Sequence, residues 1–216
     1  MTEPTIRPSR PEDVAAAVPL IFSAGPDAYN FVFGHKTPVD AQGFLTHAFV
    51  CTGGEFSWPV HWVMELDGEV VGTAAGYTGK TARHFMWPAI AQILRCNGII
   101  AGAGVIRRGL QIERIVVPPR RADLFYIANV GIAPHHRGKG LGWTLLKHMH
   151  EEGRRQGATV AALDVSMENP RAEALYRRIG YRIVRETPST LRNAAGHVPG
   201  HRRMEFALPD APLEVE

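Results

Sequence analysis

The feature that most constrains the fold is a run of alternating glycines, HHRGKGLG, at residues 135–142. An apolar segment, DLFYIANVGI, precedes this run, and a segment with apolar residues at helical spacing follows it. This order predicts a buried strand, a glycine-rich turn and a helix in direct succession. Glycine allows positive φ angles and close approach of a ligand, and the first N–H groups of a helix lack partners within it. We therefore expect the N–H groups of residues 138–143 to bind a phosphate or diphosphate, with added positive charge from Arg137 and Lys139.

Two other interpretations of the glycine run stay open at this stage. The run could form a tight turn without a ligand, or it could belong to a Rossmann-type dinucleotide site. Its spacing, Gly-x-Gly-x-Gly, matches neither GxxxxGKS/T nor GxGxxG. A Rossmann site also needs an acidic residue at the end of the next strand, and Asp164 stands near that place. The spacing therefore weakens the Rossmann interpretation without removing it.

The rest of the chain predicts an α/β protein (α+β in character) with one mixed sheet of about seven strands and helices on both faces. A short strand at 5–7, helices over 11–25 and 37–54 and a hairpin over 61–79 come first. After the glycine turn we expect a helix over 141–157, a buried strand over 159–167, a helix over 169–180, and strands over 181–186 and 201–208. The length of 216 residues suits a single domain.

Residues 124–132 carry apolar side chains on both faces, which predicts a central strand covered on both sides. Strict alternation places Val130 and Ile132 on the same face as Tyr126. Residues 80–122 are interpreted as a helical insertion before this strand. Their most apolar window contains Arg95 and several glycines, so it predicts two short buried segments and not a membrane span.

Two linked motifs give the chain a family resemblance. VGIAPHHRGKGLGWTLL resembles the signature of the GNAT superfamily of acetyltransferases, which bind acetyl-CoA, and Pro134 stands in its expected place. About 35 residues later, NPRAEALYRRIGY matches the second hallmark of that family, Asn-x-x-Ala-x-x-Leu-Tyr-x-x-x-Gly-Phe/Tyr. The resemblance is strong over 123–185 and absent over 80–122. It implies an N-acetyltransferase that moves an acetyl group from acetyl-CoA to a primary amine by direct transfer in a ternary complex.

The resemblance also implies roles for individual residues. In this family the pantetheine arm pairs with a splayed strand, whose backbone groups here belong to Val130, Gly131 and Ile132. The residues that match the diphosphate-binding turn are Arg137, Gly138, Lys139, Gly140, Leu141, Gly142 and Trp143. Asn169 is expected near the pantetheine, and it also suits a helix N-cap. Tyr176 is expected to give a proton to the departing thiolate, and the alternative is a tyrosine of the core beside Leu175.

The sequence does not identify the general base. Asp164 or a relay of water molecules is the best interpretation, Glu113 and Asp123 are weaker candidates, and Asn129 carries an amide that cannot act as a base. His135 and His136 are expected to flank the turn as exposed side chains. No metal is expected, and the acceptor amine stays open. The 80–122 insertion is the expected source of acceptor specificity, as a lid or a dimer surface.

Composition limits the other partners. The formal net charge of +3 and the two cysteines outside any CxxC pair fit a protein of the reducing cytoplasm, and no signal peptide is apparent. We expect no nucleic-acid or membrane partner, and the dimers common in the resembled family leave a homodimer open. Two rival functions remain: a non-catalytic acyl-CoA-binding module of the same fold, and a nucleic-acid binder that uses scattered arginine pairs.

Overall fold

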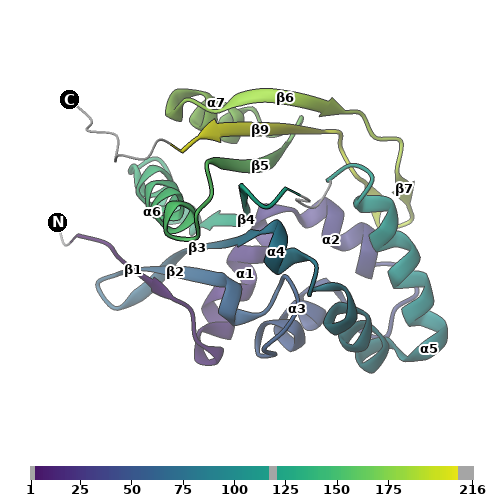
Figure 1. Cartoon of the computed structure of the whole chain (residues 1–216). Coiled ribbons are helices and arrows are strands. Elements are labelled where there is room, and N and C mark those ends of the chain that lie inside the picture. Colours follow the sequence, from purple (N-terminus) through teal and green to yellow (C-terminus); the bar gives the residue numbers. More distant parts are fainter. Residues whose placement is uncertain (1–2, 117–120, 209–216) are drawn as a thin grey trace.

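A seven-stranded mixed sheet forms the centre of the computed structural model, which describes residues 3–116 and 121–208 (Figure 1). The strand order is β1-β2-β3-β4-β5-β9-β6. Its strands are β1 (Thr5–Pro8), β2 (His61–Leu66), β3 (Glu69–Thr78), β4 (Leu124–Ile132), β5 (Val160–Ser166), β6 (Arg182–Thr187) and β9 (His201–Ala207). All neighbours are antiparallel except β4 and β5, which are parallel. The predicted fold class is confirmed.

Helices cover both faces of this sheet. On one face, α6 (Leu141–Arg155) and α7 (Pro170–Ile179) pack on the largest core, where Leu145, Leu146 and Met149 are fully buried against Phe125. On the other face lie α1 (Val14–Ala24) and α3 (Ala41–Phe49). Helix α2 (Pro26–Phe33) and the short pair β7 (Arg192–Asn193) and β8 (Gly196–His197) were not predicted. The short helix α4 (Gly79–Ala82) follows β3, and the described residues also form three 3-10 turns: Pro11–Asp13, Trp58–Val60 and Pro134–His136.

A bulge in β4 changes which side chains share a face. The register against β3 shifts between Thr73 and Ala75, and Asn129 adopts a positive φ of 54°. Beyond the bulge, Val130 and Ile132 pack on the same core as Phe125, while Tyr126 and Ala128 belong to a separate cluster on the opposite face. The prediction that Val130 and Ile132 share a face with Tyr126 is therefore wrong, because one extra residue in a bulge reverses the alternation.

The insertion before β4 is a bent helix, α5 (Met86–Ile112), which breaks at Gly98 with φ 70° and ψ 178°. An added Cβ at Gly102 would lie 2.9 Å from Leu94 Cδ2, so the two halves meet at a tight corner. The predicted two segments are confirmed, but they are only partly buried. By length and composition alone, α5 is long and apolar enough to cross a membrane. The break at Gly98 leaves each half shorter than the ~20 residues of a straight span.

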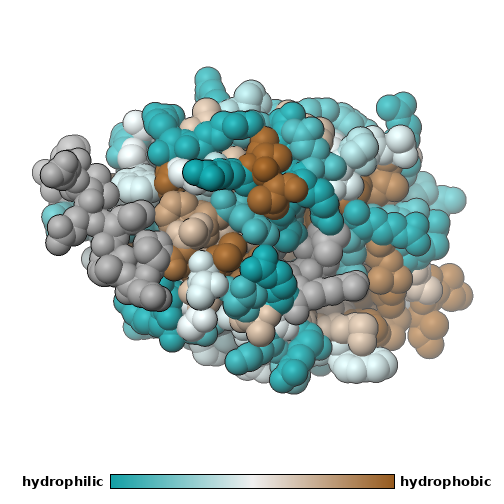
Figure 2. Space-filling view, turned by 45° about the horizontal axis from the view of Figure 1, so that its top comes forward, coloured by the Kyte–Doolittle hydropathy of each residue, from teal (hydrophilic) through white to brown (hydrophobic). Residues whose placement is uncertain are grey.

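Helix α5 carries most of the large apolar side chains that the protein exposes. Trp87 is 71 % exposed, Ile99 79 % and Ile100 93 %. The surface over α5 appears as a brown area at the right of Figure 2, on the side where α5 lies in Figure 1. The opposite surface of the helix packs against α2 and α3, so α5 encloses the space beside them.

Helix α1 presses so closely on β4 that residue 131 must be glycine. A Cβ at Gly131 would lie 2.4 Å from the carbonyl oxygen of Leu20. We expect Gly131→Ala to lower the free energy of unfolding by about 1–3 kcal/mol, since two backbones would have to separate. Urea denaturation measures this change. The matched control is Gly109→Ala, where a Cβ meets nothing within 4 Å on a helix and should slightly stabilise the protein. Equal stability of the two variants would contradict the prediction.

Candidate active site

A single long cleft brings most of the predicted residues together. Its volume is about 2020 Å³, larger than the ~300–1,000 Å³ of a pocket for one small ligand. The cleft runs from the glycine turn, past the ends of β4 and β5, to the inner side of α5. A space of this length can hold an extended cofactor at one end and a second molecule at the other.

The cofactor end begins where β4 and β5 separate. The two strands pair only from Leu124 to Tyr126, opposite Val160–Ala162. Val130, Gly131 and Ile132 follow on β4, line the cleft and have no partner on β5 among the described residues. Unpaired backbone at a strand edge can pair with an extended ligand. The three predicted backbone positions thus lie at a splayed edge.

The glycine turn has the conformation that its composition predicts. Gly138 and Gly140 have φ angles of 79° and 83°, and an added Cβ at either would meet nothing within 4 Å. Gly140 directly precedes the first residue of α6, so the free N–H groups of that helix face the cleft end. Gly138, Gly140, Gly142 and Trp143 line the cleft. The turn therefore offers an open anion cradle.

Three predicted residues of the turn differ in their position relative to the cleft. The Leu141 side chain is buried in the core, so only its backbone lies beside the cleft. Arg137 lines the cleft, and its Nε donates a hydrogen bond to the carbonyl oxygen of Ile132 at 2.9 Å. Lys139 is exposed and is not among the cleft-lining residues that the structure describes.

Helix α7 brings the second motif to the same cleft. Asn169 caps this helix, since its side-chain oxygen accepts a hydrogen bond from the Ala172 N–H at 3.1 Å, and it also lines the cleft. Both interpretations of Asn169 are thus compatible with its position. Tyr176 is 8 % exposed and lines the cleft, and burial raises its pKa to about 12. A phenol with that pKa carries its proton at neutral pH and can act as a donor.

Asp164 lies in the cleft wall, but other groups already engage its carboxylate. Arg203 approaches both oxygens, with distances of 3.0 Å from Nε and 2.6 Å from Nη2. The Tyr126 hydroxyl donates a further hydrogen bond at 2.8 Å, and the Asp164 side chain is 2 % exposed. This arrangement favours an anchor between β4, β5 and β9 over the predicted role as a base. Of the two weaker candidates, Asp123 forms an exposed ion pair with Arg121, and neither member of this pair is among the described cleft-lining residues.

The bulge at Asn129 is held by a hydrogen-bond chain that the sequence did not predict. The Tyr29 hydroxyl donates to Asn129 Oδ1 at 2.7 Å, and Asn129 Nδ2 lies 3.3 Å from His61 Nε2. The other ring nitrogen of His61 lies 2.9 Å from the carbonyl oxygen of Ser57, so it carries the proton. Burial lowers the pKa of His61 to about 4, which keeps this ring neutral. The chain fixes a strained backbone next to the splayed edge.

A carboxyl group that sequence reasoning missed lies farther along the cleft. Glu55 follows the Gly53-Gly54 pair, is half-buried and lines the cleft, as does its neighbour Tyr77 on β3. Burial and the nearby charge of Glu113 raise the pKa of Glu55 to about 7. No motif surrounds Glu55, and only its place beside a glycine pair in a loop could have drawn attention to it.

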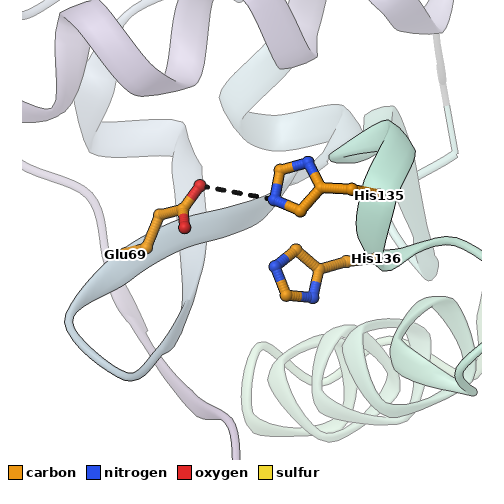
Figure 3. Close-up of side chains that lie close together, drawn as sticks. All are labelled: Glu69, His135 and His136. Atoms are coloured by element: carbon orange, nitrogen blue, oxygen red, sulfur yellow. Dashed lines mark ion pairs between the residues drawn. The ribbon is translucent and has the colours of Figure 1, made fainter.

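Among the described residues, one group of side chains could hold a metal ion. It lies at the mouth of the cleft, apart from Tyr176 and Asp164. Figure 3 shows Glu69 from the start of β3 beside His135 and His136 of the 3-10 turn Pro134–His136. His135 Nε2 lies 3.6 Å from Glu69 Oε1, and both side chains are 62 % exposed. His136 is half-buried and lines the cleft mouth. The carboxylate and the imidazole already form an ion pair when His135 is protonated.

Comparison with known proteins agrees with this geometry. The sequence model of the acetyltransferase (GNAT) family matches residues 41–181, which is more than half of the chain. Streptothricin acetyltransferase of Streptomyces lavendulae is 40 % identical over 55 residues. That match covers 26 % of this chain and 29 % of the relative, so it concerns less than a third of either protein.

Solved structures share the fold over nearly the whole chain. An N-acetyltransferase from Staphylococcus aureus Mu50 superimposes with a TM-score of 0.68 at 17 % identity, covering 94 % of this chain and 100 % of its own. The protein yncA from Salmonella typhimurium, solved with its cofactor acetyl-CoA, has a TM-score of 0.56 at 18 % identity and covers 99 % and 100 %. At such identities the likeness concerns the fold.

Proposed function

Because the chain belongs to the acetyltransferase (GNAT) family and is an acyltransferase, we propose that it transfers the acetyl group of acetyl-CoA directly to a primary amine. The observation that carries this proposal is the splayed edge of β4 beside the open glycine turn. The residues present suit acetyl-CoA: backbone at Val130, Gly131 and Ile132 that has no described partner on β5 matches the amides of pantetheine, and the N-terminus of α6 matches the diphosphate.

The protein's own groups define the chemistry around the thioester. The amine nitrogen attacks the thioester carbonyl carbon, and backbone N–H groups near Ile132 stabilise the negative oxygen that forms. The carbon–sulfur bond then breaks, and the sulfur leaves with the electron pair. Tyr176 gives the sulfur its proton and regains one from water. Acetyl-CoA supplies the activated acyl group, and the mechanism requires no metal.

The acceptor is a primary amine of a small molecule or of a protein. The inner end of the cleft, beyond the splayed edge, is large enough to admit it. Among the relatives, streptothricin acetyltransferase bears the name of a small-molecule acceptor. A short local match of that kind supports the reaction type, and the acceptor must be identified by assay.

Tyr176→Phe should lower kcat by about 10²-fold or more with little change in acetyl-CoA affinity, because the phenol acts only when the sulfur departs. Release of free thiol with a panel of amines measures kcat, and calorimetry measures affinity. The control is Tyr181→Phe, a buried tyrosine whose ring centroid lies 5.8 Å from that of Tyr176 and whose hydroxyl is 2.7 Å from His150 Nε2. If acetyl-CoA binds but the wild type consumes no amine, the non-catalytic module is the correct function.

A further inference from the structure

We propose that Glu55 receives the acceptor amine and acts as its general base, and that the acceptor carries an apolar body that lies along α5. This inference rests on the proposed function and deepens it. The base was the part of the site that sequence reasoning left open, and the carboxylate of Asp164 is bound by Arg203. Glu55 is a carboxyl group of the same cleft that is not engaged by a cation in any described contact.

A chain of contacts connects the loop of Glu55 to the splayed edge, where the thioester is expected. The next residue, Phe56, packs edge-on against Tyr29, with ring centroids 5.8 Å apart, and the Tyr29 hydroxyl binds the side chain of Asn129 at 2.7 Å. Asn129 directly precedes Val130, the first residue of the splayed edge. Tyr77 on β3, the strand that pairs with β4, lines the same cleft and interacts with Glu55. The loop that carries Glu55 is thus connected through Phe56 and Tyr29 to the residue that precedes the splayed edge.

The groups around Glu55 keep its carboxyl group available for proton transfer near neutral pH. Tyr29 on α2, Tyr77 on β3 and Glu113 at the end of α5 are the titratable groups that interact with it, and Arg203 on β9 lies farther out, near Tyr77. Both tyrosines have pKa values raised by burial, so they stay neutral. A base whose pKa lies near the working pH transfers protons most effectively.

The wall beside Glu55 defines the class of acceptor. Helix α5 contributes apolar side chains to the cleft, among them Ile90, Ile93, Val105 and Ile106, and Phe56 and Phe85 continue this surface. An ammonium group can bind the Glu55 carboxylate while an aliphatic or aromatic body covers these side chains. A small polar amine would leave the apolar wall in contact with water. The site therefore favours a hydrophobic primary amine.

The proton steps balance with these groups. The acceptor arrives as an ammonium ion, and Glu55 takes one of its protons and later passes that proton to water. The neutral nitrogen forms its bond to the carbonyl carbon, and the carbon–sulfur bond breaks when the tetrahedral intermediate collapses. The nitrogen loses its second proton to water in that collapse, while Tyr176 protonates the sulfur. One amide, one thiol and one released proton result.

The test compares Glu55→Gln with Glu113→Gln, the same chemical change at an exposed position on the cleft rim. With acetyl-CoA and 2-phenylethylamine as probes, kcat/KM of the wild type should fall as pH decreases through about 7. Glu55→Gln should lower kcat/KM at pH 8 by about 10²-fold or more and abolish this acidic limb. Glu113→Gln should keep the activity and move the limb to lower pH, because it removes a neighbouring negative charge. The acetyl-CoA dissociation constant should not change in either variant.

Two further measurements test the acceptor class and the titration of Glu55. The wild type should use 2-phenylethylamine at least tenfold more efficiently than ethylamine, and equal efficiency would overturn the hydrophobic acceptor.

Burial raises the pKa of Glu55 in the folded state. The contribution of Glu55 to stability is therefore complete below the ordinary pKa of about 4.5 and is lost as pH rises through about 7. The melting temperature of Glu55→Gln relative to the wild type should therefore increase between pH 5 and pH 8. Wild-type activity in Glu55→Gln overturns this inference alone, whereas bound acetyl-CoA with no amine consumed overturns the proposed function as well.

Discussion

Gly140→Val should weaken acetyl-CoA binding by at least about 10²-fold. A branched side chain at this position enters the open space in front of the first N–H groups of α6, where the diphosphate is expected. Loss of two hydrogen bonds to a charged ligand, at about 1.5–3 kcal/mol each, corresponds to that factor or more. Isothermal titration calorimetry with acetyl-CoA measures the dissociation constant directly.

The other end of the same helix offers a matched control. Gly157 has a φ of 76°, and an added Cβ there also meets nothing within 4 Å. Valine at either glycine strains a left-handed backbone, so both variants should lose stability to a similar extent, about 1–2 kcal/mol or more. Only Gly140→Val should lose the ligand. Similar affinities in the two variants would show that the glycine turn is merely a turn.

Asp164→Ala should lower the free energy of unfolding by about 3–5 kcal/mol. The change removes the carboxylate that faces Arg203, whose side chain is only 10 % exposed, and breaking a buried ion pair on one side leaves a poorly compensated charge. Urea denaturation at pH 7 measures the loss. The same removal at Asp123, whose ion pair with Arg121 is about half exposed, should produce no comparable change.

A second variant separates the anchor from the base at this position. Asp164→Asn keeps the shape of the side chain and one oxygen that can accept hydrogen bonds from Tyr126 and Arg203, loses the second acceptor, and cannot take up a proton. If Asp164 is an anchor, folded Asp164→Asn should retain kcat within about tenfold of the wild type. A loss of 10²-fold or more, with acetyl-CoA affinity intact, would return Asp164 to the role of base.

Local sequence signals predicted the secondary structure around the glycine turn well. The glycines before α6, the Asn169 cap and the positive φ of Gly180 at the end of α7 are all consequences of backbone chemistry within a few residues. Their placement required no knowledge of distant parts of the chain. The bounds of the elements from β4 to α7 were therefore predictable to within about two residues.

The features that were missed depend on contacts far apart in sequence. The bulge at Asn129 is fixed by Tyr29, a hundred residues earlier, so alternation in β4 alone gave the wrong face for Val130. Glu55 differs from other glutamates only because α2, β3 and the end of α5 surround it. Such environments form only when the chain is folded, and neither spacing nor composition encodes them locally.

The placement of α5 has an evolutionary consequence. Strands β3 and β4 are antiparallel neighbours that a short turn could join, yet the chain between them makes a long excursion through a bent helix. Mutations in that segment can change the apolar wall of the cleft without disturbing the glycine turn or the splayed edge of β4. Descendants of this enzyme can therefore change their acceptor substrate while they keep the same acyl donor.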